Sequence, residues 1–178
     1  VGMLTYFDDN FPESLKCIKN PPVLLYYRGK LPQFDQRRFI SIVGTRHLSD
    51  YGRKNTFKIA HDLAKAGATV VSGMAIGIDG VAHAGALSVG AKTVAVLGSG
   101  IDVCYPDVHN NLARAIVADG CVMTEYAPGS KPERQHFPAR NRIISGLCQG
   151  TLVIEGSMSS GALITASHAI AQGRELFA

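Results

Sequence analysis

The chain is 178 residues long, with 46% hydrophobic and 18% charged residues and a formal net charge of +4. This length and composition exclude an intrinsically disordered protein and indicate one large domain with a sizeable core. The small excess of basic residues is compatible with an anionic partner or with an ordinary solvated surface. The sequence has no secretory leader and no run of 18 apolar residues, so we expect a cytoplasmic protein without a membrane span.

The four cysteines do not form a recognisable framework. They are Cys17, Cys104, Cys121 and Cys148. Their spacings fit neither a zinc site nor a set of disulfides. We therefore expect buried, reduced thiols, no bound metal and no cofactor.

Residues 1–38 predict an N-terminal extension packed on the core, with a helix at 11–18 and a strand at 21–30. From residue 39 onward strands and helices alternate, which predicts the main domain at 39–178. Its expected strands occupy 39–44, 68–73, 92–98, 121–126, 151–156 and 174–178. Its expected helices occupy 51–67, 78–90, 107–120, 140–150 and 161–173. Because the last expected strand runs to the final residue, we expect this domain to be truncated.

The expected strands are continuous apolar runs, which are typical of a parallel sheet covered by helices on both faces. Right-handed crossovers then predict an α/β fold with a doubly wound, mostly parallel sheet. In such sheets, ligands bind beyond the carboxyl ends of the strands. We therefore expect the site where five strand-to-helix turns meet, at 44–52, 72–79, 98–107, 125–138 and 155–162.

These turns are rich in glycine, which lets the backbone approach a ligand closely. The helix starts at Ser72–Gly73 and Ser160–Gly161 would offer N–H groups to an anion, with Gly77 close by. The alternative is that these glycines only permit tight turns. The sequence contains neither G-x-x-x-x-G-K-[ST] nor G-x-G-x-x-G, so it does not support a P-loop or a dinucleotide cofactor.

Several side chains near these turns could take part in acid–base chemistry. Asp79 and His83 lie four residues apart on one expected helix, either as an acid–base pair or as a helix cap beside a packed histidine. Glu125 and Glu155 each end a strand, so they would either be catalytic or anchor loops. The G-L-C-Q-G stretch around Cys148 resembles a nucleophile elbow, but a helix precedes it and a strand follows, the reverse of that motif.

Basic residues gather at the expected rim, with four cations against one acid between positions 131 and 142. The stretch HFPARNRIISG places two arginines and an asparagine where a helix should begin. Cations that neutralise phosphates, beside an aromatic ring that stacks on a base, are typical of single-stranded nucleic-acid binding. In the alternative interpretation, Arg140 or Arg142 pairs with Glu125 or Glu155 and only braces the rim. The candidates are Arg46, Lys131, Phe137, Arg140, Asn141 and Arg142.

Five stretches, in this order and spacing, closely resemble the DprA/Smf family of bacterial DNA-processing proteins. They are IVGTR (42–46), SGMAIGIDGVAH (72–83), VLGSGIDVCYP (96–106), HFPARNRIISGL (136–147) and IEGSMSSGALITA (154–166). The resemblance covers about residues 11–178 and implies an extended Rossmann-like core that binds single-stranded DNA without catalysing a reaction. It also implies protection of incoming DNA in natural transformation, loading of the recombinase RecA, and a homodimer. It places Arg46, Phe137, Arg140, Asn141 and Arg142 in or near the DNA pocket, and Lys131 more loosely.

Two other functions stay open. Phosphoribohydrolases of the lysine-decarboxylase-like group resemble this chain in their glycine-rich turns and would use Glu125 or Glu155 as acid or base. They carry P-G-G-x-G-T-x-x-E, whereas EGSMSSGALIT has neither the PGG nor the glutamate. A module that senses a mononucleotide is the third reading. Apolar residues on the expected helices 107–118 (Leu112, Ile116 and Val117) and 162–171 belong either to a dimer surface or to the core.

Overall fold

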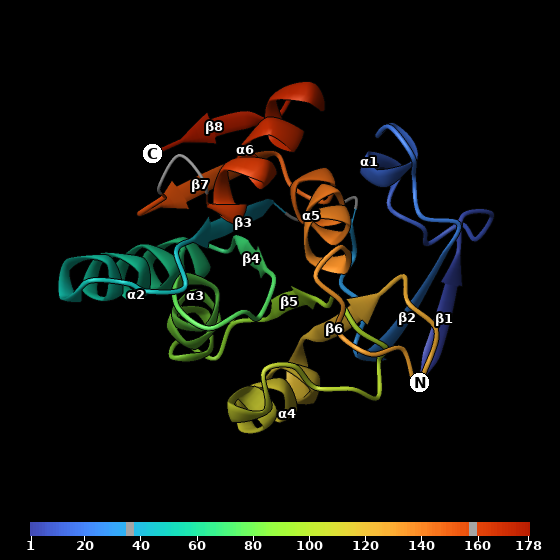
Figure 1. Cartoon of the computed structure of the whole chain (residues 1–178), viewed down its shortest axis with the longest axis horizontal. Helices are drawn as coiled ribbons and strands as arrows, with labels where there is room; N and C mark the ends of the chain where they lie inside the picture. The colour runs from blue at the N-terminus through green and yellow to red at the C-terminus, as the bar shows by residue number, and fades with distance from the viewer. Residues whose placement is uncertain (35–37, 157–159) are drawn as a thin grey trace.

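The computed structural model describes residues 1–34, 38–156 and 160–178, shown in Figure 1. Its strands are β1 (Gly2–Thr5), β2 (Leu24–Gly29), β3 (Phe39–Gly44), β4 (Thr69–Ser72), β5 (Thr93–Val96), β6 (Cys121–Thr124), β7 (Gly150–Ile154) and β8 (Glu175–Phe177). Its helices are α1 (Glu13–Lys16), α2 (Asp50–Lys65), α3 (Ile78–Leu87), the 3-10 turn η1 (Asp107–His109), α4 (Asn110–Asp119), α5 (His136–Gly146) and α6 (Gly161–Ala171).

All eight strands form one sheet in the order β1-β2-β6-β5-β4-β3-β7-β8. The six strands from β6 to β8 are parallel to one another, while β1 and β2 are antiparallel to their neighbours. Strands β4, β5 and β6 are buried along their whole length, as continuous apolar runs require. The predicted α/β fold with a doubly wound, mostly parallel sheet is confirmed.

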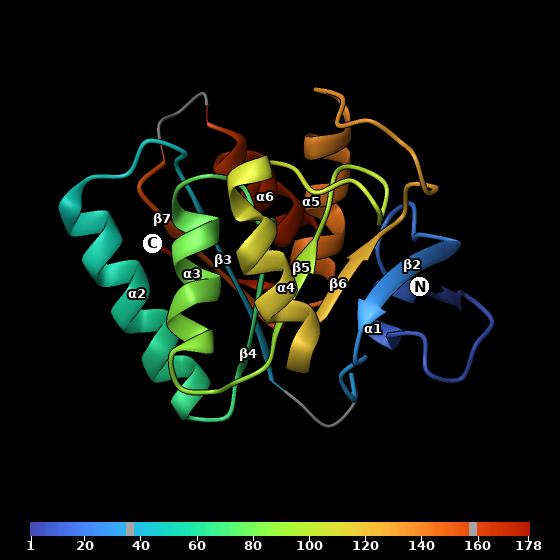
Figure 2. The ribbon, with the colours of Figure 1, turned by 90° about the horizontal axis from the view of Figure 1, so that it is seen from below.

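Helices cover both faces of the sheet. Figures 1 and 2 show α2, α3 and α4 on one face and α1, α5 and α6 on the other. Ile116 of α4 is fully buried against the sheet, with Leu112 and Val117 packed beside it. Those three apolar residues therefore belong to the core and not to a free surface.

The chain reverses its direction across the sheet at β3. It winds outward from β3 through β4 and β5 to β6, then returns to the other side of β3 as β7. Adjacent strands whose following helices lie on opposite faces leave a crevice beyond their carboxyl ends. In Figure 2 the starts of the helices α2, α3, α5 and α6 lie toward the upper edge of the molecule. The crevice between β3 and β7 is therefore where a ligand site is expected.

The N-terminal segment extends the sheet, because β2 pairs with β6 and β1 pairs with β2. Strand β1 was not predicted, since its four residues include a single buried side chain, Leu4, and give no clear periodicity. Leu15 of α1 packs into the same core cluster as Ile143 of α5 and Leu147, the residue after α5. The division of the chain at residue 38 stays a prediction.

Helix α5 begins at His136, four residues before the predicted start at 140. The sequence interpretation placed Pro138 ahead of the helix, but the first turn tolerates proline because its N–H groups have no acceptor within the helix. The helix ends before Cys148, and β7 begins at Gly150, so the G-L-C-Q-G stretch is not a nucleophile elbow.

All four cysteines are free, and Cys17 is exposed, which corrects the expectation that every thiol is buried. Within residues 1–34, 38–156 and 160–178, no helix is both long and apolar enough to cross a membrane. The same residues contain no cluster of three or more His, Cys, Asp or Glu side chains suited to a metal ion.

Candidate functional site

A cavity of about 520 Å³ opens at the crevice between β3 and β7. One wall is the turn that follows β3, from Val43 to Arg46. Helices α5 and α6 supply most of the remaining wall, from their first turns to Ile144 and Thr165. The cavity therefore joins segments that the sequence analysis placed on one rim.

Aromatic rings and a cation form one side of this cavity. The guanidinium carbon of Arg46 lies 5.6 Å from the centre of the Phe137 ring, and Arg46 is exposed. The Tyr105 ring lies 5.6 Å from the Phe137 ring at an angle of 42°. These two tilted rings offer apolar surface beside a positive charge. Tyr105 was missed as a candidate, although it lies in the VLGSGIDVCYP stretch that the analysis had singled out.

Arg140 forms the floor of the cavity and is only 3% exposed. Its Nη1 donates to the carbonyl oxygens of Gly73, at 2.7 Å, and of Val96, while its Nε donates to Asn141 Oδ1 at 3.2 Å. Nη2 makes no hydrogen bond to any described residue. Burial lowers the pKa of Arg140 to about 10, so the side chain stays protonated at neutral pH. The cavity floor is thus a fixed cation with one nitrogen available to a ligand.

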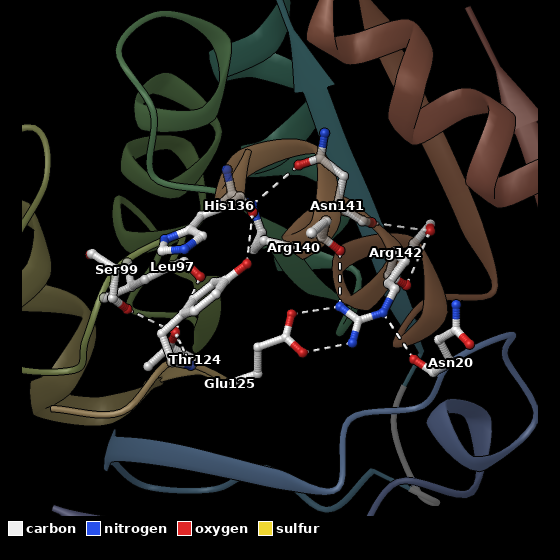
Figure 3. A network of polar contacts seen from close by, with 12 residues as sticks. Asn20, Leu97, Ser99, Thr124, Glu125, His136, Arg140, Asn141 and Arg142 are labelled. Atoms are coloured by element: carbon white, nitrogen blue, oxygen red, sulfur yellow. Dashed lines mark hydrogen bonds and ion pairs between the residues drawn. The ribbon is translucent and has the colours of Figure 1, made fainter. Parts of the chain in front are cut away.

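Arg142 points away from the cavity. Its Nη1 and Nη2 donate to the two carboxylate oxygens of Glu125, both at 2.6 Å, as Figure 3 shows. Its Nε donates to the carbonyl oxygen of Asn20 at 2.9 Å. Residues two apart on an α-helix point about 200° apart, so Arg140 and Arg142 cannot face the same ligand. Arg142 thus pairs with Glu125, as the alternative interpretation has it, and it does not line the cavity; its expected contact with a phosphate stays a prediction.

In the turn between β4 and α3, internal hydrogen bonds occupy the polar groups that the sequence had offered to a ligand. Asp79 Oδ2 accepts hydrogen bonds from the backbone N–H groups of Gly73, at 3.1 Å, and Ala75, at 3.3 Å. The Ser72 hydroxyl donates to the Ile42 carbonyl at 2.7 Å. The Ser72 hydroxyl and the Gly73 N–H thus have partners within the chain, and their expected donation to a ligand stays a prediction. Gly73 instead lies against the Arg140 guanidinium, where a side chain would displace it.

Gly77 serves the same turn through its backbone. Its φ is 94°, and a Cβ there would collide with the Thr45 carbonyl oxygen and lie 2.7 Å from the Arg46 Cα. Glycine therefore lets the β4–α3 turn press against the turn that carries Arg46.

The start of α6 faces the cavity. Ser160, Gly161 and Ala162 line the cavity, and α6 has no acidic residue in its first turn. Asn141 Nδ2 donates to the Gly161 carbonyl at 3.2 Å, which ties α5 to this helix start. A Cβ on Gly161 would meet no described atom within 4 Å. The N–H groups of this helix start can therefore meet an anion, although residues 157–159 of the expected turn lie outside the described residues.

The other acid–base candidates have structural partners. Glu155 accepts hydrogen bonds from the Ser49 hydroxyl and from the Ser49 N–H, at 3.0 Å, and these bonds lower its pKa. His83 is bonded through Nδ1 to Thr93 Oγ1 at 2.8 Å and does not pair with Asp79. Glu125 and Glu155 both anchor neighbouring segments, and neither lines the cavity.

Two basic residues lie outside the cavity floor. Arg134 lines the cavity, although the sequence analysis counted it only as part of a basic run. Lys131 is exposed and is not among the lining residues. A count of charges along the sequence does not show that Arg134 lines the cavity and Lys131 does not, since the two residues lie three apart in one irregular segment.

Comparison with known proteins gives one consistent family. Residues 2–178 match the family described as DNA recombination-mediator protein A. The chain is 47% identical over 177 residues to the protein Smf of Synechocystis sp., covering 98% of this chain and 44% of that protein. It is 46% identical over 173 residues to the DNA processing protein DprA of Streptococcus pneumoniae, covering 96% of this chain and 60% of that protein. The chain thus spans about half the length of these curated relatives.

Solved structures agree with the fold. The X-ray structure of DprA from Streptococcus pneumoniae has a TM-score of 0.92 and 41% identity, covering 98% of this chain and 61% of that one. DprA from Helicobacter pylori, whose structure is described for its single-stranded DNA binding mode, has a TM-score of 0.89 and 30% identity, with coverages of 98% and 79%. The molybdenum cofactor carrier protein of Chlamydomonas reinhardtii has a TM-score of 0.56 and 14% identity, with coverages of 79% and 75%, which is a likeness of fold alone.

Proposed function

The chain belongs to the DNA recombination-mediator protein A (DprA/Smf) family, and we propose that its cavity binds single-stranded DNA without sequence preference. The observation that carries this proposal is the pairing of a fixed cation with an open helix start. Arg140 presents Nη2 from the floor, and the first turn of α6 presents its N–H groups from the wall. Both favour a phosphate group in a partly enclosed site.

The aromatic side of the cavity suits a nucleobase. Phe137 and Tyr105 provide a surface on which any base can stack, and Arg46 adds a charge above the ring. Because stacking does not depend on base identity, this arrangement favours sequence-independent binding. A duplex keeps its bases stacked inside, so it cannot place one against Phe137. Single strands should therefore bind more tightly than duplexes.

The proposed DNA contacts differ from the sequence candidates in defined ways. We assign direct contact to Arg46, Arg134, Phe137, Arg140, Asn141, Ser160 and Gly161. Ser72, Gly73, Gly77 and Arg142 support the cavity walls through internal contacts. Lys131 would contact the strand outside the cavity, since it lies on the exposed segment that leads to Arg134.

The wider biological role rests on the family and on its longer members. We propose that the full protein protects incoming DNA during natural transformation and helps to load the recombinase RecA, as a cytoplasmic homodimer. We propose that it does so without catalysing a reaction. The internal bonds of Glu125 and Glu155 support this, since they occupy the two carboxylates that a hydrolase would have used.

A fluorescence-anisotropy titration tests the proposal. Single-stranded and duplex oligonucleotides of one sequence are compared at several salt concentrations, with Arg46→Ala and, as a control, Arg114→Ala on the exposed side of α4. We expect Arg46→Ala to weaken single-strand binding about tenfold and to flatten the slope of log affinity against log salt by about 0.7. Unchanged affinity and slope for Arg46→Ala, or equal binding of duplex, would contradict the proposal.

The phosphoribohydrolase alternative has its own test. The protein is incubated with nucleoside monophosphates, and release of free base is measured. Release that is abolished by Glu125→Gln or Glu155→Gln would favour the enzyme. Tight binding of a mononucleotide without any affinity for oligonucleotides would instead favour a nucleotide sensor.

A further inference from the structure

Helix α5 is held on the side that faces away from the cavity. Arg142 uses Nη1, Nη2 and Nε to bind Glu125 and Asn20, and Nη1 also donates to the Ala139 carbonyl at 2.9 Å. The Arg142 and Glu125 side chains are only 15% and 21% exposed. Figure 3 shows the two side chains facing each other, with Asn20 beside them. A bidentate pair of this kind fixes both the distance and the orientation of its partners.

The N-terminal segment reinforces the same helix at its other end. A Cβ on Gly146 would lie 2.9 Å from Leu15 Cδ2 and 3.0 Å from Ile18 Cγ2, so α1 packs directly on the end of α5. Arg174 Nη2 donates to the carbonyl oxygens of Ser14, at 3.0 Å, and Gly146, at 3.1 Å. None of these N-terminal residues lines the cavity.

The opposite face of α5 carries cavity residues whose own contacts depend on its placement. Arg140 reaches the carbonyl oxygens of Gly73 and Val96 only when α5 lies at this distance from the sheet. Phe137 meets Tyr105 and Arg46 from the first turn of the same helix. A short helix moves as a rigid body, so a shift at Arg142 moves these side chains with it.

We propose that Arg142 is a positioning residue for the DNA cavity: its pair with Glu125 and its bond to Asn20 fasten α5 between the sheet and the N-terminal segment. This inference rests on the proposed function for its ligand, but not for its geometry. It assigns to the second arginine of the HFPARNR stretch a role distinct from phosphate contact. It also makes the first 34 residues a support of the site, although they touch no part of the cavity.

The titration of single-stranded DNA separates positioning from contact. Positioning predicts that Arg142→Gln and Glu125→Gln each weaken binding about tenfold, that the double variant is no worse than either, and that the salt slope stays at the wild-type value. Direct contact predicts a slope flatter by about 0.7 for Arg142→Gln, and equal or tighter binding for Glu125→Gln, which removes a negative charge. That second pattern would overturn the proposal.

Matched controls come from a remote ion pair. Lys30 and Asp119 form an exposed pair at 3.0 Å, with side chains 63% and 69% exposed. Lys30→Gln and Asp119→Asn remove the same charges as the test variants but leave α5 untouched, so we expect unchanged binding. Arg142→Lys covers the case in which the neutral variants fold poorly. It keeps the positive charge and loses the bidentate geometry, so it should weaken binding if Arg142 positions the helix, and binding as tight as wild type would overturn the proposal.

A second readout needs no DNA. The chain contains no tryptophan, so Phe137→Trp introduces a single tryptophan into the cavity wall, and its emission can be excited apart from that of the tyrosines. In that background, Arg142→Gln and Glu125→Gln should shift the emission maximum and raise quenching by acrylamide, while Asp119→Asn should do neither. An unmoved tryptophan in folded variants would overturn the positioning role whatever the DNA result. A moved tryptophan in a protein that does not bind DNA would instead refute the proposed function alone.

Discussion

Two helix starts at the same rim, those of α3 and α6, look alike in sequence and differ in structure. Both follow a strand of the parallel sheet and a serine–glycine pair, but α3 begins at Ile78, five residues after Gly73, whereas α6 begins at Gly161 itself, directly after Ser160. Before α3, Asp79 accepts hydrogen bonds from the loop N–H groups of Gly73 and Ala75, and the Ile78 N–H at the helix start donates to the Thr45 carbonyl at 3.1 Å. At α6, the first turn contains no acid, and its start lines the cavity. The difference is one carboxylate in the first turn of the helix.

This comparison indicates what makes a helix start an anion site. The unpaired N–H groups and the positive end of the dipole are present at every helix start. They remain available only where no neighbouring side chain has already accepted their hydrogen bonds. An Asp or Glu within the first turn therefore argues against a phosphate site, and this can be read directly from sequence.

Removal of Asp79 should have the largest effect. Asp79→Ala leaves the buried N–H of Gly73 and the half-buried N–H of Ala75 without an acceptor and removes the negative charge near Arg140, so we expect the free energy of unfolding to fall by about 3 kcal/mol. Asp79→Asn keeps an acceptor and should lose less. The control is Asp50→Ala, an exposed acid in the first turn of α2, which should cost about 0.5 kcal/mol. Urea denaturation measures all three, and a loss at Asp79 no larger than at Asp50 would remove the basis of the comparison.

Acidification should lower the stability of the protein, chiefly through the buried histidine of α3. Burial lowers the pKa of His83, on α3, from 6.5 to about 3, whereas His168, on α6, is only partly buried and its pKa is lowered less. Below pH 6.5 the unfolded chain binds a proton that buried His83 does not, so stability falls as pH falls from 6.5 toward 3. By pH 5 the loss should be about 2 kcal/mol.

The variant His83→Gln isolates this contribution from that of Asp79. Burial raises the pKa of Asp79, so its protonation in the folded state opposes the loss due to His83. Both proteins keep Asp79, and the difference between their pH profiles therefore reports on His83. Urea denaturation near pH 7 and pH 5 gives the two profiles, and parallel curves would show that His83 is not held neutral.

A carboxylate added at the start of α6 should change the stability of the protein less than the substitutions above. It should nevertheless clearly weaken the binding of single-stranded DNA. Gly161→Asp places a carboxylate at the mouth of the cavity, so we expect single-strand affinity to fall about tenfold through repulsion of phosphate. Stability should change by less than about 1 kcal/mol, because the carboxylate also favours the helix dipole. Gly161→Ala adds a methyl group without charge and is the matched control. Equal affinities for the two variants would indicate that the strand does not approach α6.

Much of the fold follows from pattern alone. Buried strands such as β4 and β5 are continuous apolar runs, and their regular alternation with helices specifies the parallel sheet and its rim. Strand β1 could not be recognised, because it has four residues and its pairing with β2 is what defines it. The start of α5 was misplaced because proline is permitted in a first helical turn as well as before one.

The site was predicted less completely than the fold. The sequence indicated that Arg140, Arg142, Glu125 and Phe137 share a rim, since each follows a strand end. Arg140 and Arg142 lie two residues apart on α5 and therefore point to different sides of the helix. Which of them faces the cavity depends on how α5 is placed, and the sequence did not give the start of this helix correctly. Tyr105 depends on a contact with Phe137 across two loops, which local pattern does not encode.

The two walls of the cavity are synthesised at different times, because β7 lies beside β3 in the sheet but comes much later in the sequence. Strand β3 pairs with β7 in a register that joins Ile40 to Gly150, so one wall is synthesised early and the α6 wall near the end. Pairings this distant along the chain form late, because a long loop must close first. A nascent chain that lacks α6 would carry Arg46 and Phe137 without the opposing helix start. We therefore expect a nascent chain to bind single-stranded DNA only after nearly the whole domain has been translated.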